Sequence, residues 1–228
     1  MEKNSFSDST YKSALKNNTC WESFSVGRFE ISLKRVQDME KLIEAISSDE
    51  FNKDERLPYW ADLWPSALGL SQYLVENENE IKNKQILELG CGLGLVGITA
   101  SYCGGDVLFT DYEPMALEFT QSNFMRNFNR PAAVQYMDWR NPHTDKSFDV
   151  ILAADVLYEK RWLEPVINVI QECLNDHGTV LIAEPDRSIA KDFFNMIDNL
   201  NWKHHSQLKR VSVGNKLNSV SIHRISEC

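Results

Sequence analysis

The stretch ILELGCGLGLVG at residues 86–97 decides the fold. Its apolar run stops at Glu88, and four glycines follow within eight residues: Gly90, Gly92, Gly94 and Gly97. A strand that ends in a glycine-rich turn and then opens a helix lets a ligand contact the main chain, because missing Cβ atoms allow close approach and the first helical turn offers free N–H groups. A tight turn explains one or two glycines but not four. The stretch therefore predicts a ligand site between a strand and a helix.

After residue 84, apolar runs typical of strands alternate with amphipathic helical runs. The expected strands are residues 85–89, 106–111, 133–138, 148–155 and 178–184. The expected helices begin in the glycine run, at Pro114, after Tyr158 and near Ile189. Residues 205–213 and 218–225 flank a Gly214-Asn215 turn, which indicates an antiparallel hairpin. This alternation predicts an α/β fold with a mostly parallel sheet, helices on both faces and ligands at the carboxyl ends of the strands.

The first 84 residues are less regular. Residues 24–33 alternate like one strand, residues 36–47 and 65–74 have helical patterns, and the polar residues 47–56 predict a loop. We expect a single domain, because the chain has 228 residues and single α/β domains often reach about 250. Residues 1–55 would form an N-terminal extension or cap, with a strand and a helix, that is part of this domain.

The chain is acidic, with a formal net charge of −9 and a pI near 5.1. Its Lys and Arg residues are scattered, no apolar run approaches the roughly 20 residues of a membrane span, and the start lacks the apolar stretch of a signal peptide. We therefore expect no nucleic-acid or membrane partner, and a cytoplasmic location. The cysteines and histidines show no metal-ligand or redox spacing, so we expect no metal and a reducing compartment.

Two classes of ligand compete for the glycine run. Gly92, Gly94 and Gly97 match G-x-G-x-x-G, and Asp111 lies about 20 residues further on, where a dinucleotide site needs a partner for the ribose. Glu88 argues against a dinucleotide, because a carboxylate at the end of the strand repels a pyrophosphate. The same carboxylate suits a cationic ligand such as S-adenosylmethionine, which carries an ammonium and a sulfonium group.

The run ELGCGLGLVG resembles the first motif of the seven-strand S-adenosylmethionine-dependent methyltransferases. Further segments resemble one branch of that family, which contains the protein-lysine methyltransferases of chaperones and of the electron-transfer flavoprotein β-subunit. These segments occur in the family's order between residues 59 and 188: LWPSALGLSQYL, TDYEPMALEFTQSN, DWR and AADVLY. The resemblance implies a Rossmann-like, doubly wound sheet of seven strands, in a methyltransferase domain at residues 56–228.

The resemblance also implies which residues of the glycine run bind S-adenosylmethionine. Gly90, Cys91 and Gly92 would line its methionine portion, and Glu88 would orient that loop. Gly94 belongs to the same motif and is included in the predicted cofactor site.

Other cofactor contacts would come from neighbouring segments. Asp111, at the end of the second strand, would accept both ribose hydroxyls. Trp139 would border the adenine, with Asp138 near its amino group, although plain core packing is an alternative role for Trp139. Trp64 would contact the cofactor from the N-terminal side, and Ala154 would contact it through the backbone.

The segment DVLY at residues 155–158 matches the D-x-x-Y motif of this branch, at the end of the fourth strand. The hypothesis is that Asp155 attracts and orients a cationic amine, that Tyr158 lines its channel, and that water carries the proton away. The residues alone leave Asp155 open as a helix cap and Tyr158 as a buried aromatic. Glu184, Asp186 and Arg187 would lie on the same rim, without an assigned role.

The resulting hypothesis is an S-adenosylmethionine-dependent N-methyltransferase that acts on a lysine side chain of a protein and releases S-adenosylhomocysteine. A small amine or a nicotinamide-type heteroaromatic nitrogen is the alternative acceptor. The chain could also be an inactive cofactor-binding interaction module, and an oxidoreductase using a nicotinamide nucleotide comes last. A protein acceptor predicts an open acidic groove, whereas a small acceptor predicts a lidded apolar pocket. The oligomeric state is left open, with a monomer favoured.

Overall fold

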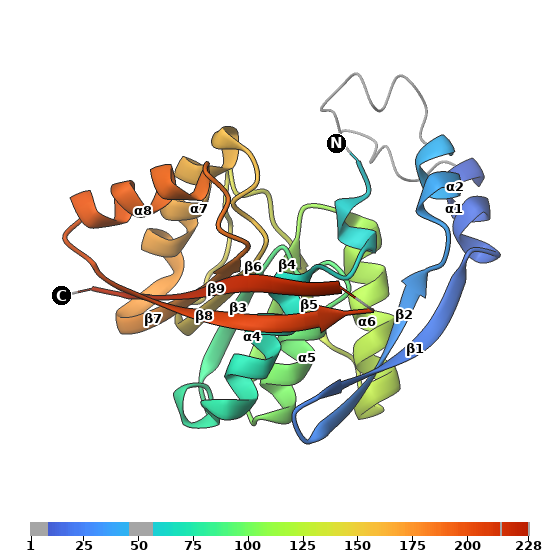
Figure 1. Cartoon of the computed structure of the whole chain (residues 1–228), viewed down its shortest axis with the longest axis horizontal. Coiled ribbons are helices and arrows are strands. Elements are labelled where there is room, and N and C mark those ends of the chain that lie inside the picture. Colours follow the sequence, from blue (N-terminus) through green and yellow to red (C-terminus); the bar gives the residue numbers. More distant parts are fainter. Residues whose placement is uncertain (1–8, 46–56, 215, 228) are drawn as a thin grey trace.

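A seven-stranded sheet forms the centre of the structure (Figure 1). The computed structural model describes residues 9–45, 57–214 and 216–227, and its strand order is β5-β4-β3-β6-β7-β9-β8. The strands are β3 (Gln85–Leu89), β4 (Asp106–Asp111), β5 (Ala133–Tyr136), β6 (Phe148–Ala154), β7 (Leu174–Glu184), β8 (Lys203–Val213) and β9 (Lys216–Ser226). The first five strands are parallel, whereas β9 runs antiparallel to both β7 and β8. The predicted α/β fold with a C-terminal antiparallel hairpin is confirmed.

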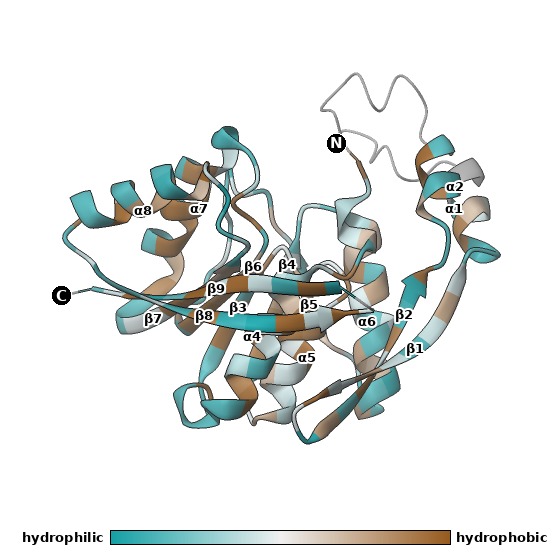
Figure 2. Cartoon of the chain, viewed as in Figure 1, coloured by the Kyte–Doolittle hydropathy of each residue, from teal (hydrophilic) through white to brown (hydrophobic). Residues whose placement is uncertain are grey.

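Helices cover both faces of this sheet, as predicted. One face packs against α4 (Pro65–Glu76), α5 (Leu95–Tyr102) and α6 (Pro114–Phe128), and the other against α7 (Lys160–Cys173) and α8 (Ala190–Asn199). Strand β3 supplies both cores, because successive side chains of a strand point to opposite faces. Ile86 belongs to the first core, while Leu87 and Leu89 belong to the second. Figure 2 shows that α7 and α8 carry hydrophobic and hydrophilic residues together, as helices with one buried face do.

The N-terminal segment differs from the expectation of one strand at residues 24–33. Two antiparallel strands, β1 (Thr19–Val26) and β2 (Phe29–Val36), are joined by a tight turn in which Gly27 has a φ of 57°. Apolar residues alternate on both sides of Gly27 and Arg28, so the two strands were predicted as one. The helical pattern at residues 36–47 yields the shorter α2 (Met39–Glu44), and α1 (Ser9–Lys16) was not predicted. The loop predicted at residues 47–56 and residue 215 of the hairpin turn lie outside the described residues.

Two asparagines of α6 attach this β1–β2 hairpin to the rest of the domain. The Asn127 side chain accepts a hydrogen bond from the Ser32 N–H at 3.0 Å and donates one to the Ser32 carbonyl at 2.7 Å. Asn123 accepts from the Lys34 N–H at 2.6 Å and donates to the Leu93 carbonyl at 2.8 Å. The two side chains share one face of α6 because they are four residues apart. They satisfy backbone groups along the free edge of β2 and so protect that edge from pairing with another chain.

Gly97 shows why the glycine run has a further glycine inside α5. A Cβ at this position would overlap the Phe109 ring of β4 and the Glu88 carboxyl of β3. We therefore expect Gly97→Ala to lower the free energy of unfolding by about 1–3 kcal/mol, as overpacking of a core does. Urea unfolding monitored by circular dichroism measures the effect. Ser101→Ala, on the same helix and only half-buried, is the control and should stay within about 0.5 kcal/mol of the wild type. Equal stability of Gly97→Ala and the wild type would contradict this packing.

Candidate active site

One pocket lies at the carboxyl ends of β3, β4 and β6, and it encloses about 1150 Å³, open space at its mouth included. Strand β3 has β4 on one side and β6 on the other, so the chain leaves β3 toward one edge of the sheet and later returns on the opposite side. Such a reversal leaves a crevice above the strand ends, which is where doubly wound sheets bind their ligands.

The structure brings nearly all the predicted site residues together in this pocket. Its lining includes Trp64, Glu88, Gly90, Cys91, Gly92, Asp111, Asp138, Trp139, Ala154, Asp155 and Tyr158. Gly94 is not among the lining residues. It adopts a left-handed φ of 82° at the N-cap of α5, and a Cβ there would press against Thr120 of α6. Gly94 therefore shapes the start of the helix behind the loop.

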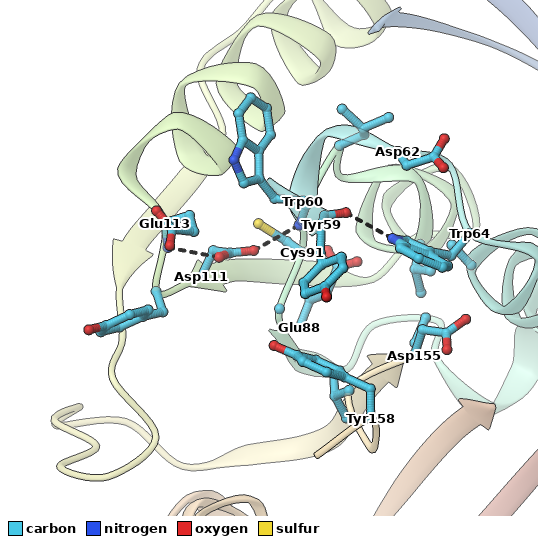
Figure 3. Close-up of a pocket in the computed structure, with 18 of the residues that line it drawn as sticks. Tyr59, Trp60, Asp62, Trp64, Glu88, Cys91, Asp111, Glu113, Asp155 and Tyr158 are labelled. Carbon is cyan, nitrogen blue, oxygen red and sulfur yellow. Dashed lines mark hydrogen bonds between the residues drawn. The ribbon is translucent and has the colours of Figure 1, made fainter. Parts of the chain in front are cut away.

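Asp111 connects the end of β4 to the glycine loop. Its carboxylate accepts hydrogen bonds from the Gly92 N–H and the Glu113 N–H, both at 2.9 Å (Figure 3). Burial raises the pKa of Asp111 to about 6, although these two N–H groups lower it in part. Each carboxylate oxygen has a second lone pair, so Asp111 keeps the capacity to accept hydroxyl groups from a ligand.

Glu88 is a buried acid beneath the first turn of α5, with only 3% of its surface exposed. Burial raises its pKa to about 8, the Gly97 N–H opposes this rise, and the negative charge of Asp111 adds to it. The Oε2 atom of Glu88 has no hydrogen-bond partner among the residues that the structure describes. A buried acid with a raised pKa at the wall of a pocket is typical of a functional site, and a cationic ligand would stabilise its ionised form.

Aromatic residues that precede α4 form a second wall of the pocket. Tyr59 and Trp60 lie in the short 3-10 helix η2 (Tyr59–Ala61), and the Trp64 Nε1–H donates a hydrogen bond to the Tyr59 carbonyl at 2.8 Å. The Tyr59 ring contacts Tyr158 edge to face, with 5.6 Å between centroids. Tyr59 and Trp60 were not predicted as site residues, although they stand where the family resemblance begins.

Asp155 is paired with a cation in this structure. It is 8% exposed, has a left-handed φ of 58°, and accepts a hydrogen bond on Oδ1 from the Arg187 Nη2 at 2.5 Å. It does not cap the next helix, because the N-cap of α7 is Glu159. Arg187 was expected on the rim without a role, and its contact with Asp155 was not predicted.

Tyr158 of the D-x-x-Y segment is half-buried beside Asp155 in the pocket lining. Burial is the main cause that raises the pKa of its phenol, and the negative charges of Glu159 and Asp111 add to the rise. The phenol therefore stays protonated at neutral pH and can donate a hydrogen bond but cannot serve as a base.

The residues predicted near an adenine also line the pocket. Trp139 is largely buried and packs edge to face on Trp162, at 5.9 Å between ring centroids. The Arg140 guanidinium donates to both Asp138 oxygens, from Nε at 2.9 Å and from Nη2 at 2.7 Å. The Asp138 carboxylate is thus oriented by Arg140, a residue that the sequence analysis did not single out.

Within the described ranges, no group of three or more His, Cys, Asp and Glu side chains is arranged to hold a metal ion, and no helix is long and apolar enough to cross a membrane. Two histidines that are distant in sequence do meet: His204 and His223 share a hydrogen bond of 2.8 Å, and His223 Nε2 lies 3.1 Å from the Glu184 Oε1. This chain of side chains runs from β8 through β9 to the end of β7. It holds Glu184 in place beside Arg187.

Comparison with solved structures identifies the class of fold. The 16S rRNA methyltransferase RsmC of T. thermophilus, in complex with AdoMet and guanosine, matches 93% of this chain and 51% of its own, with a TM-score of 0.63 and 12% identity. The magnesium protoporphyrin IX methyltransferase ChlM of Synechocystis, with bound SAM, matches 78% of this chain and 94% of its own, with a TM-score of 0.56 and 15% identity. At such identities the likeness concerns the fold alone, which is the Rossmann-like fold of S-adenosylmethionine-dependent methyltransferases.

Sequence comparison then identifies the family. The model of the family described as lysine methyltransferase matches residues 50–200, more than half of the chain. The electron transfer flavoprotein beta subunit lysine methyltransferase of Danio rerio is 33% identical over 66% of this chain, and the EEF1A lysine methyltransferase 3 of Mus musculus is 33% identical over 63%. The chain belongs to the lysine methyltransferase family, which confirms the predicted resemblance. The matched region spans 58% and 64% of the length of these two relatives.

Proposed function

We propose that the protein is an S-adenosylmethionine-dependent methyltransferase that modifies a lysine side chain of a protein. One observation carries this proposal: the same pocket has the buried carboxylate of Asp111 beside the glycine loop and a second carboxylate, Asp155, beside aromatic side chains. Figure 3 draws Asp111 and Glu113 on one side of the pocket and Asp155 and Trp64 on the opposite side, with Glu88 between them. The membership of the chain in the lysine methyltransferase family supports the choice of acceptor.

The pocket fits S-adenosylmethionine in two respects. The loop of Gly90, Cys91 and Gly92 presents main chain to the pocket, so a ligand can approach it closely. Glu88 is a buried acid that lines the pocket, so a ligand with positive charge would stabilise its ionised form. When bound there, S-adenosylmethionine supplies an activated methyl group on a sulfonium sulfur.

Specific roles for the lining residues follow as part of the proposal. Asp111 accepts the two ribose hydroxyls, and the glycine loop with Glu88 holds the methionine portion. Trp139 and Asp138 border the adenine, Trp64 covers the cofactor from the N-terminal side, and Ala154 contacts it through its backbone. Gly94 contributes by opening α5 behind the loop. We further propose that the protein acts in the cytoplasm without a metal ion.

The acceptor end of the pocket suits an amine that must lose a proton. A lysine amine has a reference pKa of about 10.4, so its deprotonation at pH 7 costs roughly 4–5 kcal/mol. Precise positioning of reacting groups can supply about 7–11 kcal/mol, so no strong base is needed. Asp155 accepts a hydrogen bond from the amine, the protonated Tyr158 and the exposed Tyr59 line its path, and water takes the proton. The aromatic faces also tolerate the positive charge that develops on nitrogen.

The mouth of the pocket supports a protein acceptor over a small one. Tyr59 is 43% exposed there, and the side chain of Asp62 is 48% exposed although it lies 3.6 Å from the Arg35 Nη2. Acidic and aromatic groups that reach solvent suit a basic residue presented by another protein.

Incubation with tritiated S-adenosylmethionine tests the proposal. The protein should transfer label to a protein band of a cell extract, and the electron transfer flavoprotein beta subunit and EEF1A, named for the relatives, are the first purified candidates. Mass spectrometry should find the added methyl groups on lysine. Label confined to small solutes would favour a small amine acceptor, and binding of the cofactor without any transfer would favour an interaction module.

The binding of S-adenosylmethionine should release a proton near neutral pH. The pKa of Glu88 is about 8 without ligand, so this carboxyl is mostly protonated at pH 7, and a cationic ligand favours its ionised form. Affinity should therefore rise with pH toward 8, and it should fall below pH 6 as Asp111 becomes protonated. Calorimetry at pH 7 in Tris and in phosphate, which differ in ionisation enthalpy, should report close to one proton released. Glu88→Gln is the control that should abolish the release, whereas identical heats in both buffers for the wild type would contradict it.

A further inference from the structure

The ion pair between Asp155 and Arg187 leaves one acceptor atom free. The Arg187 Nη2 binds Oδ1 of Asp155, while Oδ2 is buried and has no hydrogen-bond partner in the described part of the chain. A buried carboxylate oxygen without a donor is unfavourable in a folded protein, since it has lost its water. Asp155 lines the pocket at the end where we place the acceptor. The free oxygen is therefore available to a donor that enters the pocket.

We propose that Arg187 is a positioning residue for methyl transfer. It holds Asp155 by Oδ1 and leaves Oδ2 to accept a hydrogen bond from the substrate amine. Its positive charge favours the neutral form of that amine. This inference rests on the proposed lysine methyltransferase function and assigns a role within the same site. Arg187 acts through Asp155 and through its electric field, without contacting the reacting atoms.

The local structure fixes Arg187 where this role needs it. The Arg187 N–H donates to the Glu184 Oε2 at 2.8 Å, and Glu184 is itself buried at the end of β7 and held by His223. Asp155 is fixed from its own backbone, because its N–H donates to the Ala183 carbonyl at 2.9 Å. The pair therefore joins the ends of β6 and β7, two strands that are paired in the sheet. These hydrogen bonds hold the backbones of both residues at the place where their side chains meet.

The charge of Arg187 prevents Asp155 from stabilising the unreactive ammonium form of the substrate. An unpaired Asp155 would attract the lysine as an ammonium ion and stabilise that form, which has no lone pair and cannot react. A cation close to an amine disfavours its protonated form, and a charge within about 4–6 Å shifts a pKa by about 1–3 units. The Asp155–Arg187 pair is close to neutral as a whole. It can accept a hydrogen bond from the neutral amine without holding its proton.

Other ionisable groups surround the same region. Besides Asp155, the acidic and basic residues in the pocket lining are Asp62, Glu88, Asp111, Glu113, Asp138, Glu159 and Arg161, and those behind Arg187 are Glu184 and His223. The Tyr158 phenol also faces the pocket and stays protonated, because burial raises its pKa. All these groups remain in a variant that changes Arg187 alone. A difference between the variant and the wild type therefore reports the effect of Arg187.

Methyl transfer to the amine involves one proton and two electron pairs. The ammonium of the substrate gives one proton to water, the nitrogen lone pair forms the bond to the methyl carbon, and the carbon–sulfur bond breaks with its electron pair left on sulfur. Arg187 and Asp155 exchange no proton in this step. Their contribution is to raise the share of bound substrate that carries a free lone pair.

Arg187→Gln removes the charge and keeps a hydrogen-bonding side chain. The substrate is the protein identified in the tritium experiment. We expect kcat and KM at pH 7.5 both to fall about tenfold, because the variant binds the ammonium form of the substrate more tightly in the ground state. The ratio kcat/KM should stay within about threefold of the wild-type value. The midpoint of the kcat–pH profile should rise by about one unit. Calorimetry of the same substrate with the S-adenosylhomocysteine complex should show tighter binding, a readout that does not depend on turnover.

Two further variants make this test specific. Arg187→Lys keeps the charge and should restore the wild-type pH profile. Arg224→Gln removes the same charge from an ion pair with Glu80 that is distant from the carboxyl ends of the strands, and it should leave all parameters unchanged. A purely structural role of Arg187 predicts a lower kcat/KM with an unmoved pH profile, and that result would overturn the inference. If the wild type labels no protein at all, the proposed function and this inference are both wrong. If the wild type transfers methyl groups and the kcat–pH profile of Arg187→Gln superimposes on the wild-type profile, only this inference is wrong.

Discussion

Asp155→Asn should lower kcat/KM for the lysine substrate by roughly 10³-fold, an effect at the upper range for loss of one preorganised electrostatic group. The amide removes the negative charge that faces the substrate and leaves the positive charge of Arg187 without its partner, so a cationic lysine is repelled. Asparagine is the appropriate replacement because Asp155 has a φ of 58°, a conformation that asparagine adopts readily and alanine does not. Steady-state transfer of tritiated methyl groups measures the loss, and calorimetry should show that S-adenosylmethionine still binds.

A second aspartate provides a matched control for this variant. Asp186 also has a left-handed φ, of 56°, but its side chain accepts a hydrogen bond from the Ser221 Oγ at 2.9 Å and is not part of the pocket lining. Asp186→Asn should therefore keep near-normal turnover. Normal turnover of Asp155→Asn would remove Asp155 from the proposed mechanism.

Asp111→Asn should weaken the binding of S-adenosylmethionine by about 10²–10⁴-fold. A hydrogen bond to a charged group contributes about 1.5–3 kcal/mol, and Asp111 would provide two of them to the ribose. The amide also replaces one of the two oxygens that hold the Gly92 and Glu113 N–H groups, so the glycine loop loses part of its support. Calorimetry of the purified variant gives the dissociation constant directly.

The loss should lie in binding and not in folding. Burial raises the pKa of Asp111 to about 6, above its ordinary value, so the folded protein binds this proton more tightly than the unfolded chain. The ionised carboxylate therefore makes the folded state less stable as pH rises through this range, and a neutral amide avoids that effect. Asp106→Asn, at the exposed amino end of the same strand, is the control and should bind the cofactor normally. Wild-type affinity of Asp111→Asn would contradict the proposed ribose contact.

The fold followed from patterns that are local in the sequence. Residues 85–89 and 148–154 are short apolar runs, and Pro114 stands at the first turn of α6 as predicted. Such signals can be read residue by residue because strand and helix periods involve near neighbours. The boundaries were less certain: β7 begins at Leu174 and not at residue 178, since the strand continues directly from the end of α7.

The candidate site was predicted only in part, for a physical reason. The glycine loop, Asp111 and Asp155 could be placed because each follows an expected strand, and parallel strands bring their carboxyl ends to one edge of the sheet. Tyr59 and Trp60 were missed because they precede the first parallel strand by many residues, with no periodic signal. The type of a residue indicates which ligand groups its side chain can bind. It does not indicate which other side chain of the protein lies beside it.

The amino-acid sequence alone determined the α/β class, the alternation of strands and helices, and a pocket at the strand ends with carboxylates that suit a cationic ligand. Only the tertiary structure decided that Arg187 pairs with Asp155, that Asn123 and Asn127 hold the N-terminal hairpin, and that Glu88 is a buried acid with a raised pKa. These contacts join residues that are far apart in the chain, and burial depends on everything packed around a group. Neither leaves a periodic pattern in the sequence, so both appear only once the chain is folded.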